Sequence, residues 1–287
     1  MTMLVWARSP PRRTRLNSNP GERRIDPRGV VHVAVSPPKT LDGELLKRVA
    51  SITGKEIPDV RLLLAGEIPR IVVSFNDADA ANAIVRGLKD AGLVAFVCAD
   101  SELRRRSTAF AAHAADPGEG GVMFKDRRGR EVRVGPGDAF LVLRGRVKSA
   151  AQETTLTTKT KLNVTATVLT GGIPVIRQVT RKTTQESFRA EDFVRIFDRR
   201  SSDPRVEMFQ NQLDYSFLGP ALTPSAPANF EILVNKLRQG FPLAIFDDRL
   251  TRASKSDVPV AGPEERLEIN GKLIYLSYLA MERMAQP

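Results

Sequence analysis

Residues 41–99 read LDGELLKRVASITGKEIPDVRLLLAGEIPRIVVSFNDADAANAIVRGLKDAGLVAFVCA, and this stretch has the clearest periodicity in the chain. Apolar residues recur at helical spacing through 41–52, 60–64 and 80–88, whereas 71–75 and 93–98 are short apolar runs. A further run, VVHVAV at 30–35, precedes the stretch. The pattern predicts a module with the order strand, helix, helix, strand, helix, strand.

Capping and turn residues mark the ends of the three expected helices. Thr40 is placed to cap the first helix, and Gly54 to follow its last turn. Pro58 suits the first turn of the second helix, and Asn76 is placed to cap the third. The inner face of the third helix is predicted to consist of Ala80, Ile84 and Leu88.

A family resemblance lies within this module. The run from Thr53 to Gly66, with Pro69 close behind, resembles the helix-turn-helix of the C-terminal domain of the bacterial ribosomal stalk protein, and AIVRGLKDAGLVA at 83–95 is similar to that family's closing helix end. The resemblance covers residues 30–99 and implies that fold. The family recruits translation factors through a basic helical face, of which Arg61 keeps one position. At most, the resemblance implies an adaptor that grips a partner's peptide or helix.

Four features of the stalk family are missing from this chain. Pro58 stands where that family usually has a Lys, and Leu62 stands where it usually has an acid. The dimerisation helices and the Ala-rich hinge of the family are absent as well. We therefore carry over the fold, and not the ribosomal role.

The composition changes after residue 100. Residues 101–121 hold an Arg triplet, an Ala-rich run and the sequence DPGEGG, which predict a linker. From 122 onward short strands are expected, threonine is dense between 154 and 184, and Gly171-Gly172 is expected to turn a long hairpin. A helix is expected to start at Ser225 or Asn229 and to end at Gly240.

The predicted fold class is α+β. By element order alone, residues 120–240 weakly resemble a pleckstrin-homology-like barrel, with six or seven antiparallel strands closed by one helix; a split sandwich with a packed helix is the alternative. The expected divisions are a disordered basic tail at 1–29, the stalk-like module at 30–100, a linker at 101–121, an antiparallel β domain with its closing helix at 122–250, and a linker plus C-terminal helix at 251–287.

The C-terminal segment has two possible structures. Asn270-Gly271 suits a type I′ hairpin turn. Against that, apolar residues keep helical spacing from Ile269 to Met284, so we predict a helix. This helix is expected to dock on the body through Tyr275 and Leu279.

Composition excludes several function classes. The net charge is +11 over 287 residues, and seven Arg against two acids place +5 of it in residues 1–29. Cys98 is the single cysteine, which excludes an intramolecular disulfide and a multi-cysteine zinc site. No apolar run approaches a membrane-spanning length. These features predict a cytoplasmic protein of prokaryotic type, without a transmembrane segment.

No motif predicts an enzyme or a cofactor. The glycine-rich runs near 118 and 135 lack the context of a phosphate-binding loop, and no serine lies in a nucleophile-elbow pattern. His32 and His113 have no suitable neighbours in sequence. The pair Asp247-Asp248 is flanked by Arg249 and Arg252, which favours a solvated turn over a metal site.

Basic residues in the β half form the candidate site. If their strands are neighbours, same-face residues would converge into a cationic patch for phosphates; otherwise they keep sheet edges soluble. Our leading hypothesis is a non-enzymatic adaptor for an unknown protein partner, and the alternative is a binder of nucleic acid or acidic lipid that uses these strands and the Arg-rich tail. The candidate anion-binding residues are Arg144, Arg146, Lys148, Lys159, Lys161, Arg177, Arg181 and Lys182.

Overall fold

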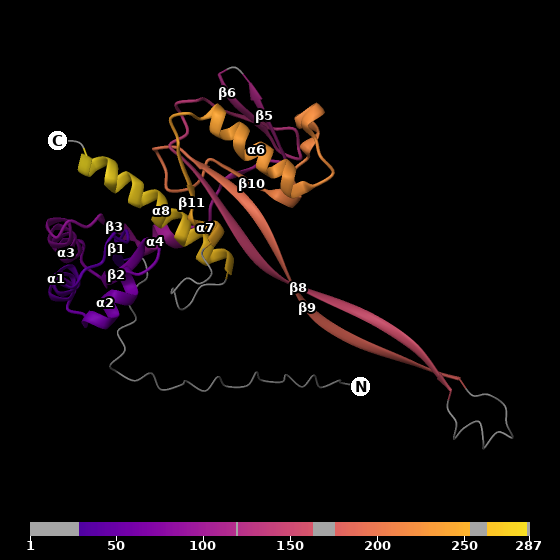
Figure 1. The fold of residues 1–287 in the computed structure, drawn as a ribbon, viewed down its shortest axis with the longest axis horizontal. Helices are drawn as coiled ribbons and strands as arrows, with labels where there is room; N and C mark the ends of the chain where they lie inside the picture. Colours follow the sequence, from indigo (N-terminus) through magenta and orange to yellow (C-terminus); the bar gives the residue numbers. More distant parts are fainter. Residues whose placement is uncertain (1–28, 119, 163–175, 253–262, 286–287) are drawn as a thin grey trace, which may run out of the picture.

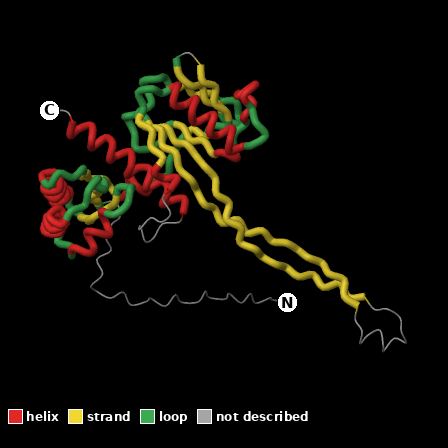
Figure 2. The backbone as a smooth tube through the Cα atoms, in the orientation of Figure 1, coloured by secondary structure: helices red, strands yellow, loops and turns green. Residues whose placement is uncertain are grey.

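The computed structural model describes residues 29–118, 120–162, 176–252 and 263–285, and the fold is α+β (Figures 1 and 2). It contains a three-stranded sheet of order β2-β1-β3, a five-stranded sheet of order β11-β8-β9-β10-β4 and a second three-stranded sheet of order β5-β6-β7. The expected basic tail, the Gly171-Gly172 turn and most of the linker at 254–263 lie outside the described residues.

The N-terminal module has the predicted order of elements. Strand β1 is central and pairs antiparallel with both β2 and β3. Helices α1, α2 and α3 cover one face of this sheet, where Val33, Val35 and Val72 lie in a buried cluster. The elements are β1 (Val31–Val35), α1 (Gly43–Thr53), α2 (Ile57–Leu64), β2 (Arg70–Phe75), α3 (Ala78–Asp90) and β3 (Ala95–Ala99).

The helix caps differ from prediction at two positions. Asp42, not Thr40, caps α1 by accepting a hydrogen bond from the Leu45 backbone N–H at 2.7 Å. Asp77, not Asn76, caps α3. In both cases an aspartate one or two residues after the expected cap takes the role, because its carboxylate also complements the positive end of the helix dipole. Gly54 has a left-handed backbone with φ of 67°, as its position after α1 requires.

The inner face of α3 agrees with the prediction at Leu88 and differs from it by one residue at the two earlier positions. Ala81, Val85 and Leu88 are buried, whereas Ile84 is only partly buried. The helix begins at Ala78, so the stripe that meets the sheet starts one position later than the sequence pattern indicated.

The β domain includes part of the segment that we expected to be a linker. Residues 101–121 contain all of β4 and β5, with Ala112 and Ala115 buried in the core of the β domain, whereas α4 packs Leu103 with the small sheet and α8. The elements from here on are α4 (Asp100–Arg104), β4 (Phe110–Ala111), β5 (Ala114–Gly118), β6 (Gly121–Lys125), β7 (Glu131–Val134), β8 (Leu141–Leu162), β9 (Ile176–Phe197), β10 (Val206–Phe209), η1 (Gln210–Gln212), η2 (Tyr215–Ala221), α6 (Ala226–Gly240), β11 (Ile245–Asp248), α7 (Arg249–Arg252) and α8 (Pro263–Ala285).

The expected antiparallel barrel is not formed. The described strands of this domain form two separate sheets and no closed barrel. Two pairs in the five-stranded sheet, β11 with β8 and β10 with β4, are parallel. Strand β11 comes after α6, and β4 comes before the β8–β9 hairpin. Each strand therefore needs a crossover connection to lie beside its parallel neighbour, and the turn residues in the sequence do not indicate such a connection.

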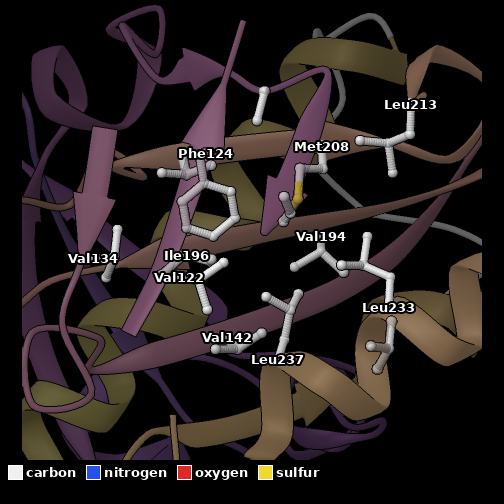
Figure 3. Close-up of a cluster of buried hydrophobic side chains, with 14 of the residues drawn as sticks. Val122, Phe124, Val134, Val142, Val194, Ile196, Met208, Leu213, Leu233 and Leu237 are labelled. Carbon is white, nitrogen blue, oxygen red and sulfur yellow. The ribbon is translucent and has the colours of Figure 1, made fainter. Parts of the chain in front are cut away.

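The main core lies on one face of the five-stranded sheet. Residues at alternating positions of β8, β9 and β10, among them Val142, Val194 and Met208, meet α6 and the β5-β6-β7 sheet (Figure 3). The predicted cap of α6 is correct, since the Ser225 side chain accepts from the Ala228 backbone N–H. The intervening positions, such as Leu143 and Phe193, face the opposite side of the sheet, where α7 and α8 lie.

Helix α8 joins the two halves of the molecule. The C-terminal segment is a helix, as predicted, and not a hairpin. Ile269 and Leu273 pack with the outer face of the small sheet, whereas Ile274 and Tyr275 pack with the large sheet. Tyr275 is buried, as expected, and its ring lies 5.3 Å from that of Phe197, centroid to centroid.

Strands β8 and β9 extend far outside the body. They pair over 22 residues each, but in the described structure β11 accompanies β8 only at residues 141–143 and β10 accompanies β9 only at residues 193–196. We call residues 141–146 of β8 and 192–197 of β9 the root of the ribbon. Beyond this root the two strands form a free ribbon that projects from the domain (Figure 2). The part of β8 from 147 to 162 spans roughly 50 Å at about 3.3 Å per residue.

Candidate functional site

The root of the ribbon is held by a cluster of charged side chains. Arg144 and Arg146 are at alternating positions of β8, opposite Val194 and Asp192 of β9. Arg144 Nη2 donates to Asp192 Oδ2 at 2.7 Å, and Arg146 Nε donates to Asp192 Oδ1 at 2.5 Å. Arg144 also binds Glu231 of α6, with Nη1 donating to Oε2 at 3.0 Å. Two cations thus meet two carboxylates.

Asp192 is ionised at neutral pH because of these contacts. Its burial alone would raise the pKa of the carboxyl group, but hydrogen bonds and charge from Arg146 and Arg144 outweigh burial and lower that pKa. Asp192 and Glu231 together balance the charges of Arg144 and Arg146. The root therefore offers little net positive charge to an external anion.

A hollow of about 320 Å³ lies at this root. Its lining includes both members of the ion pair Arg146–Asp192, together with Glu231 of α6. The lining carries one cation, Arg146, against two carboxylates, and Arg144 beside them balances the charge, so the hollow does not favour a strongly charged ligand. We assign the cluster the role of anchoring the ribbon to α6.

The outer part of the ribbon has a different charge pattern. We call residues 154–162 and 176–184 the distal ribbon; they contain five Lys or Arg and no Asp or Glu. The register pairs Lys161 with Arg177, Lys159 with Val179 and Thr157 with Arg181. Residues directly opposite one another share a face of an antiparallel ladder, as do positions two apart along a strand. Four cations therefore occupy three consecutive rungs of one face.

The eight predicted anion-binding residues are thus divided into groups. Arg144 and Arg146 lie at the root and are paired with acids. Lys148 lies opposite Ala190, just beyond the root. Lys182 belongs to the distal ribbon but occupies the ladder's other face, opposite Leu156. The set that the register brings together on one face is Lys159, Lys161, Arg177 and Arg181.

Sequence reasoning missed the acids that neutralise the root. Asp192 lies 46 residues after Arg146, and Glu231 lies 87 residues after Arg144. The one local signal was the dipeptide Glu191-Asp192, placed immediately before the apolar run at 193–197. A charged residue at the entrance of a buried strand requires a partner, but the register that supplies the partner is not visible in the sequence.

Asp247, Asp248 and Cys98 form no metal or nucleophilic site in the described part of the chain. Within the described ranges no group of three or more His, Cys, Asp or Glu is arranged to hold a metal ion. Asp247 is buried and bound by Arg249, and Asp248 binds Arg252 at 2.8 Å, so each acid has a cationic partner. Cys98 is buried, and burial raises the pKa of its thiol to about 12.

Comparisons with known proteins give no further assignment. No protein-family model, no curated protein and no solved structure matches this chain. Among the described helices, none is both long and apolar enough to cross a membrane.

Proposed function

We propose that this protein binds nucleic acid through the distal ribbon. The observation that carries the proposal is the register of β8 and β9, which gathers Lys159, Lys161, Arg177 and Arg181 onto three rungs of one ladder face. Lys161 and Arg177 are direct cross-strand partners, and like charges at such positions repel each other. When a polyanion binds, its phosphates relieve the repulsion between these cations. The release of counterions from the polyanion then favours binding.

The ribbon's position supports an external partner for these cations. The distal ribbon projects away from the rest of the described chain (Figure 1). No acid lies within its own 18 residues. At the root, by contrast, the arginines have intramolecular acids. We therefore assign the charge of the distal ribbon to a partner outside the molecule.

The composition of the distal ribbon favours nucleic acid over a membrane surface. Eight of its residues are threonine, whose hydroxyl groups donate hydrogen bonds to phosphate oxygens. Only four are large apolar residues, too few for the apolar face that membrane docking buries. It has no aromatic residue, so base stacking on a single strand has no platform here. A two-stranded ribbon also fits the major groove of a B-form duplex.

The test is binding of the intact chain to three fluorescent probes: a 24-base-pair DNA duplex, a single-stranded RNA and vesicles containing phosphatidylserine. The distal variant replaces all five distal cations: Lys159→Gln, Lys161→Gln, Arg177→Gln, Arg181→Gln and Lys182→Gln. The module variant, with the same change in net charge, replaces five exposed cations of the small module: Lys47→Gln, Arg48→Gln, Arg61→Gln, Arg86→Gln and Lys89→Gln.

We expect the native chain and the module variant to bind the duplex, and the distal variant to bind it at least about tenfold more weakly at low salt. Equal weakening in both variants would show that only net charge matters and would overturn the proposal. Binding to vesicles without binding to nucleic acid would replace it with a membrane role. Binding to none of the probes would also overturn it and favour the adaptor hypothesis.

A further inference from the structure

Three side chains of the small module form a hydrogen-bonded chain that the ribbon does not involve. His32 Nδ1 lies 2.7 Å from Ser74 Oγ, and His32 Nε2 lies 2.9 Å from Asp100 Oδ1. His32 and Ser74 are cross-strand partners of β1 and β2. Asp100, the first residue of α4, is fixed by a backbone hydrogen bond from its N–H to Val30 O at 2.9 Å. The order of contacts is serine, imidazole, carboxylate.

The carboxylate fixes the tautomer of the imidazole. Arg104 Nε donates to both Asp100 oxygens, at 2.9 and 3.0 Å. Burial would raise the pKa of Asp100, but hydrogen bonds from His32 and Arg104 outweigh burial and lower it. An ionised carboxylate only accepts hydrogen bonds, so His32 Nε2 carries a proton and donates it to Asp100. In the neutral ring, Nδ1 then holds a lone pair directed at the Ser74 hydroxyl.

The three groups differ in their access to solvent. Ser74 is exposed on β2, an outer strand of its sheet. The side chains of His32 and Asp100 are only 12% and 10% exposed. A serine open to solvent is thus paired with a base that is shielded, and the base is oriented by a third group. This is the arrangement that activates a nucleophile in acyl transfer.

From this geometry we infer that Ser74 is a nucleophilic serine that accepts acyl groups from activated esters. Ser74 Oγ attacks the ester carbonyl carbon while its proton passes to His32 Nδ1. The tetrahedral intermediate collapses and expels the alkoxide or phenolate, which takes the proton from His32. Water, deprotonated by His32, then attacks the acyl-serine and releases a carboxylic acid, and Ser74 recovers its proton.

The substrate class follows from what the three residues supply. They provide a nucleophile, a base and an orienting carboxylate, which suffice for an ester with a good leaving group. Amide hydrolysis demands strong stabilisation of an oxyanion by positioned donors as well. We therefore assign activated esters and related phosphonyl electrophiles as the reactive class. This inference is independent of the ribbon and of nucleic-acid binding.

The test is labelling of the intact chain with a fluorophosphonate probe, located by mass spectrometry of the digest. Ser74 Oγ would displace fluoride from phosphorus and form a stable phosphonyl ester. We expect the label at position 74, its loss in Ser74→Ala, and labelling slowed about 100-fold in His32→Gln and in Asp100→Asn. Ser51→Ala removes an exposed serine of α1 and should leave labelling unchanged.

A second measurement keeps the inference testable if a histidine variant fails to fold. Ser74→Cys in the otherwise native chain should be alkylated by iodoacetamide at neutral pH at least ten times faster than Ser51→Cys, because a neighbouring imidazole increases thiolate character. Equal labelling of Ser74 and Ser51, or labelling of Ser74 that His32→Gln leaves unchanged, would show that the hydrogen bonds only brace the outer strand, and would overturn the inference.

Discussion

Asp192 is the carboxylate that Arg144 and Arg146 share. It receives hydrogen bonds from Arg144 and Arg146 while its side chain is only 6% exposed. Without it, both guanidinium groups would face α6 with only Glu231 as an acidic partner. Its charge state therefore matters to the stability of the ribbon's root.

We predict that Asp192→Asn lowers the free energy of unfolding at pH 7 by about 1.5–3 kcal/mol, the usual value of hydrogen bonds to a charged group. The pKa of Asp192 is lower in the folded state than in the unfolded chain, where it is about 3.9. Its contribution is therefore complete above pH 4 and is lost as pH falls through the lower, folded pKa.

Urea unfolding at pH 7 and near pH 3 measures this dependence. The difference between the native chain and Asp192→Asn should shrink at the lower pH. Asp90→Asn, which changes an exposed carboxylate at the end of α3, serves as the control and should change little at either pH. A difference for Asp192→Asn that is the same at both pH values would contradict the assigned role.

At the scale of elements, Gly145 allows β8, β9 and α7 to meet closely. A Cβ at this position would lie 2.3 Å from Phe193 Cζ and 2.9 Å from Leu250 Cβ. Both distances are below any normal contact, and both neighbours belong to the buried cluster beneath α8. The ribbon leaves the body at this point, so the glycine fixes where the two-stranded part begins.

We predict that Gly145→Ala destabilises the protein by about 1–3 kcal/mol, the range for overpacking a well-packed core. Thermal unfolding measures the loss. Gly43→Ala is the matched control, because a Cβ there meets nothing within 4 Å. If Gly145→Ala unfolds at the same temperature as Gly43→Ala, the close approach at the root has no energetic significance.

Helices and caps, which depend on local sequence, were predicted better than the pairing between distant strands. The order of the N-terminal module, the cap at Ser225 and the helix at 269–284 were predictable because their periodicity and caps are local. The continuity of β9 was not, since only short strands were expected from residue 122 onward, whereas β9 is a single strand of 22 residues. The sequence in the middle of this strand is polar and rich in threonine, so it gives no apolar alternation to detect.

The candidate site was predictable only in part, for the same reason. The alternation of cations on single strands indicated which residues share a face, and the pairing of β8 with β9 required by the patch is present. The separation of the eight residues into a neutralised root and a cationic distal ribbon depends on the register and on Asp192 and Glu231. The register and the positions of these two acids depend on contacts between residues far apart in the chain, and the pattern of a single sequence does not show such contacts.

At the scale of the whole molecule, Lys272 links three parts of the chain through α8. Its side chain is 2% exposed. Its Nζ donates to the backbone oxygens of Glu102 at 2.9 Å and Arg105 at 2.5 Å, and lies 3.1 Å from Asp203 Oδ1. Asp203 belongs to the loop between β9 and β10, while Glu102 and Arg105 belong to α4 and the segment after it.

We predict that Lys272→Met destabilises the protein by about 3 kcal/mol, because it removes the buried ammonium group from two carbonyl groups and leaves Asp203 with Arg105 as its remaining cationic partner. Asp203→Asn in the same chain should recover part of this loss, which a double-mutant cycle by urea unfolding would measure. Purely additive effects of the two substitutions would contradict the coupling of α8 to the β9–β10 loop.

The most direct test of the central claim is the salt dependence of duplex binding. The slope of log K against log salt should be less steep in the distal variant than in the native chain by about four, since each cation that contacts a phosphate contributes about 0.9. Using the full-length chain in both cases cancels the contribution of the Arg-rich tail. A slope unchanged by removal of the five distal cations would show that the ribbon does not contact phosphates, and would contradict the account.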